Sequence, residues 1–275
     1  MRWILGVLVG FLVPLGAGGG FLALTSLDWS VDGRFVLFCE AGDLYIGLAP
    51  SGREARPLTS GAGTDWGRFG PGDWFVYATP VEGGYTLWRG RLSGEEPEEL
   101  LFLPALIARP AVSPDGRRIA FVSNRDGPWD LYLLDLETRQ VKRLTETDPE
   151  WLEDTPEFSP DGRFLMFVGL WGTGPEGSWD IFILDLLSGG VEQLTEDPFF
   201  DWCPRFSPDG EWIAFESNRR GPSDIYFMRR DGRNLTPFTH DAWRDAFPCW
   251  SPAGDQIGYA SLRVGGWVLL AEGTY

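Results

Sequence analysis

Six copies of one short turn motif run through the chain at regular intervals. Three copies read Ser-Pro-Asp-Gly, at 113–116, 159–162 and 207–210, and three degenerate copies lie at 29–33, 69–73 and 250–254. With the serine position of each copy as the anchor (Gly70 in the second), the anchors are residues 30, 70, 113, 159, 207 and 251. Their spacings are 40, 43, 46, 48 and 44 residues, a period typical of one four-stranded blade of a β-propeller.

Each repeat is read as four short strands. An inner strand leads into the Ser-Pro-Asp-Gly turn, in which proline presets φ and glycine supplies a positive φ. A second strand follows, the third opens with aspartate, and the fourth ends in Leu-Thr, as at Leu144-Thr145. The sequence therefore predicts an all-β fold over residues 20–275, a six-bladed β-propeller of four-stranded antiparallel blades.

The two ends of the chain suggest how the ring closes. The sixth repeat has three predicted strands before Tyr275 and lacks a fourth. The segment Phe21–Thr25 carries a Leu-Thr ending directly before the first inner strand. We therefore expect an N-terminal strand to complete the last blade, which would leave no exposed sheet edge.

Residues 1–19 form a targeting segment. A positive Met1-Arg2 precedes the apolar run from Trp3 to Val13, and Pro14 is followed by small residues at 16–18. This pattern is typical of a cleaved signal peptide. The alternative is an uncleaved membrane anchor, because no further charge appears before Asp28. Both predict that the remaining chain lies outside the cytoplasm, in the periplasm or secreted.

The charge of the chain restricts its partners. Lys and Arg number 23 against 40 Asp and Glu, a formal net charge of −17. This excess disfavours nucleic acid and anionic lipid, whose binding depends on cationic contacts. Basic partners, cations and neutral ligands remain open, and the oligomeric state is undetermined.

The cysteines and the single histidine predict no catalytic centre. Cys39, Cys203 and Cys249 match no zinc motif, and either one disulfide or three buried thiols would account for them. His240 is the only histidine, and no Gly-x-Ser-x-Gly elbow is present. We therefore assign no catalytic residue, metal ligand or cofactor.

The repeat pattern also resembles a known family. The motifs F-S-P-D-G, I-A-F-x-S-N-R, D-I-Y and L-T are similar to the WD40-like repeats of the TolB C-terminal propeller and of prolyl oligopeptidase-type propellers. The resemblance covers nearly all of residues 20–275 and implies the propeller fold. It leaves the function open, because such propellers serve many roles. TolB carries an additional N-terminal α/β domain for which this chain has no room, so its partner contacts are not transferred.

Two sets of side chains are candidates for binding. The loops that enter the inner strands combine acids and aromatics, which predicts a rim that binds a basic peptide, a sugar or a cation. The rim set is Asp148, Trp151, Asp154, Asp197, Asp201, Trp202, Trp243 and Asp245. The alternative is that the aromatics pack between blades while the acids are solvated.

The second set lies two residues before each anchor, where the period of a strand places it on the face towards the central channel. It contains Asp28, Arg68, Ala111, Glu157, Arg205 and Cys249. We expect a wet channel with cross-blade ion pairs between Asp28 and Arg68 and between Glu157 and Arg205. The pattern favours a non-catalytic module that binds a protein or peptide at the rim or channel. The alternative is a carboxylate-dependent glycan-active enzyme or a sugar-binding propeller.

Overall fold

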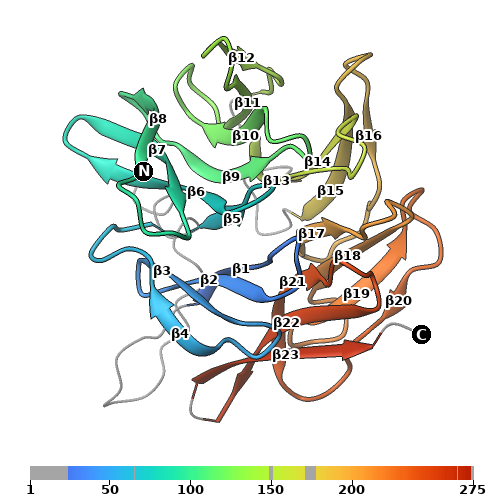
Figure 1. Cartoon of the computed structure of the whole chain (residues 1–275). Coiled ribbons are helices and arrows are strands. Elements are labelled where there is room, and N and C mark those ends of the chain that lie inside the picture. Colours follow the sequence, from blue (N-terminus) through green and yellow to red (C-terminus); the bar gives the residue numbers. More distant parts are fainter. Residues whose placement is uncertain (1–23, 65, 149–150, 171–177, 265, 274–275) are drawn as a thin grey trace, which may run out of the picture.

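A computed structural model describes residues 24–64, 66–148, 151–170, 178–264 and 266–273. These residues form six β-sheets arranged around a common axis (Figure 1). Within these ranges no helix has the length and apolarity needed to cross a membrane. The predicted targeting segment, residues 1–19, lies outside them. The repeats thus correctly predicted an all-β, six-bladed propeller.

The first three blades follow one another along the chain, each as four antiparallel strands. Blade 1 contains β1 (Leu24–Trp29), β2 (Phe35–Glu40), β3 (Asp43–Leu48) and β4 (Arg53–Pro57). Blade 2 contains β5 (Gly67–Phe69), β6 (Trp74–Val81), β7 (Gly84–Arg91) and β8 (Glu98–Leu103). Blade 3 contains β9 (Ala108–Val112), β10 (Arg118–Ser123), β11 (Asp130–Asp135) and β12 (Val141–Arg143). The first strand of each blade is the innermost (Figure 1).

Blades 4 and 5 repeat this order, whereas the described part of blade 6 has three strands. Blade 4 contains β13 (Leu152–Phe158), β14 (Phe164–Leu170), β15 (Trp179–Asp185) and β16 (Val191–Gln193). Blade 5 contains β17 (Asp201–Phe206), β18 (Trp212–Ser217), β19 (Asp224–Arg229) and β20 (Thr236–Pro237). Blade 6 contains β21 (Arg244–Trp250), β22 (Gln256–Arg263) and β23 (Gly266–Gly273).

The Ser-Pro-Asp-Gly turn ends each inner strand through local hydrogen bonds. In blade 3 the Ser113 hydroxyl donates to Asp115 Oδ1 at 2.6 Å and accepts the N–H of Arg118 at 2.9 Å. Gly116 has φ 69°, a left-handed conformation that glycine adopts without steric cost. Because these contacts are all local, the motif can be recognised from sequence alone.

The hydrophobic core is divided among the interfaces between neighbouring blades. Between blades 2 and 3, for example, Val76 and Leu87 belong to the same buried cluster as Phe121 and Tyr132. Alternate residues of each strand face the two neighbouring blades, so both faces of a blade are apolar. The polar groups that concern function therefore lie along the axis and at the two ends of the strands.

Blades 1 and 6 close the ring, since β1 packs beside both β5 and β21. The expectation that Phe21–Thr25 forms the outer strand of blade 6 is wrong for Leu24 and Thr25. Both belong to β1, where Leu24 pairs with Glu40 of β2. The inner strand of blade 1 has six residues and ends directly before the anchor Ser30. Thr25 is therefore already part of this inner strand. Residues 21–23 lie outside the described chain, so an N-terminal strand in blade 6 stays a prediction.

Candidate functional site

Four charged side chains meet on the propeller axis. Arg205 Nη1 lies 2.9 Å from Glu157 Oε2, which is the predicted pair of blades 4 and 5. The same guanidinium donates from Nη2 to the Leu27 carbonyl at 2.6 Å, and Nη2 lies 3.6 Å from Asp28 Oδ1. Arg205 therefore reaches past blade 6 to blade 1.

The second predicted pair, Asp28 with Arg68, has a different geometry. Asp28 Oδ2 accepts the N–H of Phe69 at 2.8 Å, and Arg68 Nε lies 3.8 Å from Glu157 Oε2. At the position two residues before the anchor, blades 3 and 6 carry the short side chains of Ala111 and Cys249. The long arginine side chains therefore have room to reach across these blades, from blade 2 to blade 4 and from blade 5 to blade 1. Asp28, Arg68, Glu157 and Arg205 thus form one group, the central charge network, instead of two neighbouring pairs.

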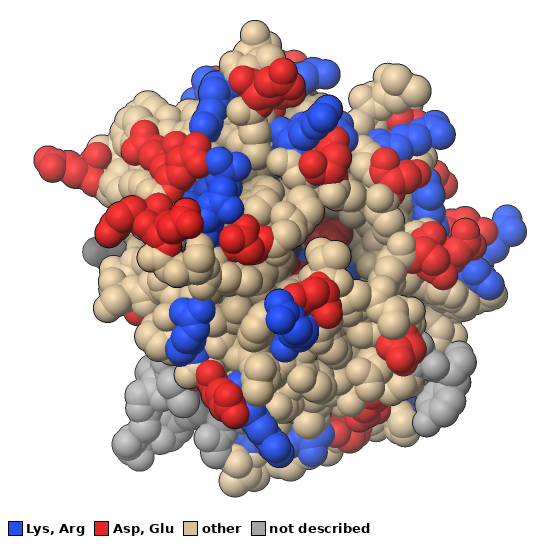
Figure 2. All heavy atoms as spheres, in the orientation of Figure 1, with Lys and Arg blue, Asp and Glu red and all other residues tan. Residues whose placement is uncertain are grey.

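The network is open towards the Ser-Pro-Asp-Gly turns. A hollow of about 140 Å³ lies there, lined by Asp28, Glu157 and Arg205 together with turn residues such as Pro160 and Pro208. The side chains of Asp28 and Glu157 are 16% and 21% exposed, against 5–6% for the two arginines. Figure 2 shows acidic and basic atoms at the bottom of a central hollow. The carboxylates are thus the charged groups nearer to the opening.

The network sets the protonation of its arginines. Burial, together with the charge of Arg205, lowers the pKa of Arg68 to about 10. Burial also acts to lower the pKa of Arg205, but the carboxylates of Glu157 and Asp28 outweigh it and raise that pKa. Both guanidiniums therefore remain charged at neutral pH.

Beyond the network, a buried tryptophan fills the channel. Trp66 is 2% exposed, and the guanidinium carbons of Arg68 and Arg109 each lie 4.5 Å from the centroid of its ring. Arg109 Nε in turn lies 3.1 Å from Asp154 Oδ1. A desolvated cation–π contact contributes about 2 kcal/mol. Beyond the hollow, the side chains of Trp66, Arg68 and Arg109 therefore pack against one another.

A bulge in the inner strands explains which side chains reach the axis. Arg109, Thr155, Cys203 and Phe247 have φ between 46° and 55°, and each lies four residues before an anchor. The inner-strand pairings of blades 3 to 6 shift register at this point. A bulge adds a residue and re-aims the side chains that precede it. None of these residues is the glycine or asparagine that usually marks such a φ, so the only sequence signal was their shared distance from the anchor.

The three cysteines are buried thiols outside any disulfide. Burial raises the pKa of Cys203 well above its usual value and that of Cys249 to about 12. Cys39 Sγ donates to the Thr64 carbonyl at 3.0 Å. At neutral pH the thiols of Cys203 and Cys249 are protonated and pack as small apolar groups.

The predicted rim is not one surface. Asp154, Asp201 and Asp245 are buried, so the expectation that they face solvent is wrong. They lie within β13, β17 and β21 and not in the loops that precede these strands. The exposed or partly exposed members are Asp148, Trp151, Asp197, Trp202 and Trp243.

Several rim aromatics pack against neighbouring aromatics. Trp202 stacks on Phe200 with ring centroids 5.4 Å apart and meets Trp179 of blade 4 edge-on at 4.5 Å. Trp151 lies 6.2 Å from Phe182. For these two tryptophans the contacts favour packing over ligand binding. Trp243 lies 5.9 Å from the guanidinium of Arg263.

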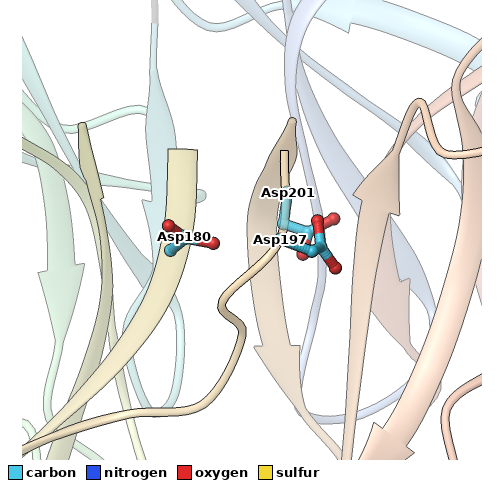
Figure 3. A group of neighbouring side chains, drawn as sticks. All are labelled: Asp180, Asp197 and Asp201. Carbon is cyan, nitrogen blue, oxygen red and sulfur yellow. The ribbon is translucent and has the colours of Figure 1, made fainter. Parts of the chain in front are cut away.

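Three rim-side carboxylates converge between blades 4 and 5. The three residues are Asp180 of β15, Asp197 in the loop before β17, and Asp201 of β17. Their carboxylate oxygen atoms lie within 4.8 Å of one another (Figure 3). Arg219 Nη2 lies 2.9 Å from Asp201 Oδ1 and 3.2 Å from Asp197 Oδ2. Burial raises the pKa of both Asp180 and Asp201. Carboxylates are suitable cation ligands, but a guanidinium already lies against two of these three.

Similar carboxylates recur at the neighbouring interfaces. Glu153, Asp201 and Asp245, each six residues before an anchor, face Asp130, Asp180 and Asp224 of the preceding blade. Within blades 4 and 5, the hydroxyls of Thr195 and Thr239 accept the N–H of the residue that follows Asp180 and Asp224, at 2.9 Å. We call Glu153, Asp201 and Asp245 the interblade carboxylates.

Comparison with known proteins agrees with this architecture. The model of one family, described as the TolB beta propeller domain, matches residues 74–270. An uncharacterized protein of Agrobacterium fabrum is 26% identical over 250 residues, which cover 85% of this chain and 64% of that protein. The chain thus spans slightly less than two thirds of that relative.

Solved structures extend the likeness of fold to proteins of different kinds. A putative TolB from Agrobacterium tumefaciens superposes with a TM-score of 0.70 at 22% identity, covering 92% of this chain and 91% of that one. An oligogalacturonate lyase in complex with manganese gives 0.60 at 16% identity, covering 91% and 76%. At these identities the likeness concerns the fold alone. Because the family match extends from β6 into β23, across blades 2 to 6, the chain belongs to the TolB β-propeller domain family.

Proposed function

We propose that the chain is a non-catalytic, extracytoplasmic binding module that takes a basic side chain of a protein or peptide partner into the hollow at the turn side of its channel. The observation that carries this proposal is the placement of Asp28 and Glu157 at the opening, above two buried arginines. The hollow of about 140 Å³ matches the end of a single lysine or arginine side chain. A net charge of −17 would steer such a partner towards the molecule.

The targeting segment supports the location. Residues 1–19 have the charge and apolar pattern of a signal peptide or anchor, which would place the propeller in the periplasm, at the membrane or outside the cell. N-terminal sequencing of the exported protein would distinguish cleavage from anchoring. At the opposite end of the propeller, the exposed Asp148 and the partly exposed Asp197 and Trp243 would provide a second, separate contact for the partner.

The alternative class, a carboxylate-dependent enzyme acting on glycans, finds less support. Such enzymes place two carboxyl groups about 5 to 9 Å apart beside a bound sugar. At the rim, Asp180, Asp197 and Asp201 place oxygen atoms within 4.8 Å of one another, and two of these residues contact Arg219. Asp201 is completely buried, so a sugar could not reach it without a rearrangement.

Binding of a cationic probe tests the proposal. We expect pentalysine to bind the full chain in isothermal titration calorimetry, with an affinity that falls as salt is added. Asp28→Asn should weaken binding by about fivefold, because one of the two charges at the opening is lost. Asp32→Asn, in the exposed turn of the same blade, is the matched control.

Equal binding by wild type and Asp28→Asn would refute the channel site, provided that the variant keeps its near-ultraviolet circular dichroism. Release of reducing ends from polysaccharides by the wild type, abolished by Asp201→Asn, would instead support the enzyme.

A further inference from the structure

The outer edge of blade 6 differs from every other blade edge in the described chain. The other five sheets each end in a fourth strand, whereas the described part of blade 6 ends at β23. All eight residues of β23 pair in unbroken register with β22, so the strand is straight and regular. An unpaired edge of this length presents a row of backbone N–H and C=O groups to a further strand.

The sequence of β23 lacks the features that normally protect an exposed edge. Natural edges are short, bulged, or carry lysine or proline. The outer strands of blades 1, 3, 4 and 5 have two to five residues, and each contains a charged residue or proline. The outer strand of blade 2, β8, is longer, but it begins with two glutamates and shifts register against β7. In contrast, β23 reads Gly-Trp-Val-Leu-Leu-Ala-Glu-Gly, without lysine, arginine or proline. Val268 is 42% exposed, and Val264 in the preceding turn is 91% exposed.

A large groove lies beside the end of this strand. It has a volume of about 1080 Å³ and is lined by four aromatic side chains of blades 5 and 6, Trp212, Phe227, Phe238 and Trp250. A groove between blades 1 and 2, where both outer strands are present, has only about 330 Å³. All four aromatics remain partly exposed. Apolar surface of this kind is stabilised when a further segment covers it.

The charge of the groove indicates the chemistry of that segment. The charged residues of its lining are Asp209 and Glu272, and no lysine or arginine is among them. The groove also shares Ser207, Pro208 and Trp250 with the lining of the central hollow, so the two surfaces are continuous. A bound segment would therefore meet the negative charges of Asp209 and Glu272.

We propose that β23 accepts a β-strand from a partner protein, an extended segment with apolar residues and at least one basic residue. Backbone hydrogen bonds to β23 would supply the affinity, and the aromatic groove and its acids would supply the specificity. The added strand completes blade 6 as the fourth strands complete the others. This site does not depend on binding at the central hollow, because neither β23 nor the acids Asp209 and Glu272 line that hollow.

Two peptides taken from the protein's own outer strands serve as probes. Residues 140–146 (QVKRLTE) carry two basic residues, whereas residues 190–196 (GVEQLTE) share the V-x-x-L-T-E pattern without any. We expect the basic peptide to slow hydrogen–deuterium exchange of the β23 amides in the full chain, and the acidic peptide to do so more weakly. Exchange reports strand pairing directly, since amides that gain a hydrogen bond are protected.

Val268→Lys tests the edge, and Leu187→Lys is its control. Both replace an exposed apolar residue, but Leu187 lies in a turn of blade 4 and is 85% exposed. We expect Val268→Lys to weaken binding of the basic peptide by about fivefold, because like charges opposite each other across paired strands are unfavourable. Leu187→Lys should leave it unchanged.

Three results would overturn the proposal. One is unchanged exchange of β23 with the basic peptide present. Another is protection of β23 in the peptide-free chain at every dilution, which would mean that residues 1–23 already cover the edge. The third is protection that appears only at high protein concentration together with a dimer in sedimentation, which would make a second copy the occupant.

Discussion

The central charge network and the interblade carboxylates both bury ionisable groups, but they balance charge differently. On the axis, two carboxylates face two arginines, and Arg205 lies within 4 Å of both acids. Between blades 5 and 6, Asp224 and Asp245 face each other, and burial raises the pKa of both. A buried charge is tolerated when it is paired, whereas an excess of one sign is relieved by binding protons. The axis should therefore be sensitive to mutation, and the blade interfaces to pH.

The largest effect should follow the loss of an arginine from the axis. Arg205→Met leaves Glu157 and Asp28 without their shared cation, and removal of one partner of a buried pair costs about 3 to 5 kcal/mol. Urea unfolding monitored by tryptophan fluorescence measures the change in the free energy of unfolding. Arg233→Met breaks an exposed pair with Asp231 and should cost less than about 1 kcal/mol. Similar small losses in both variants would show that the network contributes no more than a surface pair.

A smaller effect, distinguished by its pH dependence, should follow Glu153→Gln. Burial raises the pKa of Glu153 from 4.5 to about 7, so the folded protein holds a proton that the unfolded chain releases. The contribution of Glu153 is therefore full below about pH 4.5 and is lost as the pH rises towards 7, by about 3 kcal/mol. The variant should gain stability relative to wild type over this range.

Urea unfolding at pH 5, 6, 7 and 8 measures this difference. Glu192→Gln, at an exposed position of β16, should run parallel to wild type across the series. A Glu153→Gln curve that also runs parallel would show that the carboxyl is ionised in the folded protein throughout.

The smallest effect, with the opposite sign, concerns the repeated turn. The Ser159 hydroxyl and the N–H of Arg163 donate to Asp161 and lower its pKa. This contribution is present above the usual carboxyl pKa of about 4 and is lost as the pH falls further. Asp161→Ala should cost about 1 kcal/mol at pH 7 and less near pH 2, as measured by urea unfolding. A loss of stability that does not change with pH would mean that the Asp161 side chain contributes through packing alone.

Sequence reasoning succeeded where the determining contacts are local. The turn at Ser113 and Asp115 bonds only to itself and its own strands, so every copy could be recognised. The pair of Glu157 with Arg205 followed from the period of a strand, because both residues lie between the bulge and the anchor. On the other side of the bulge the period no longer holds. Asp154, Asp201 and Asp245 lie there, and their expected exposure was wrong for that reason.

The number of blades, their strand order and the turns that join them were determined by the sequence alone, since these depend on contacts within a few residues. The partners of the charged groups were decided by the tertiary structure. Ala111 and Cys249 leave space on the axis, so Arg205 reaches Asp28 and Arg68 approaches Glu157. These contacts depend on distances between segments far apart in the chain, which a repeat pattern does not encode.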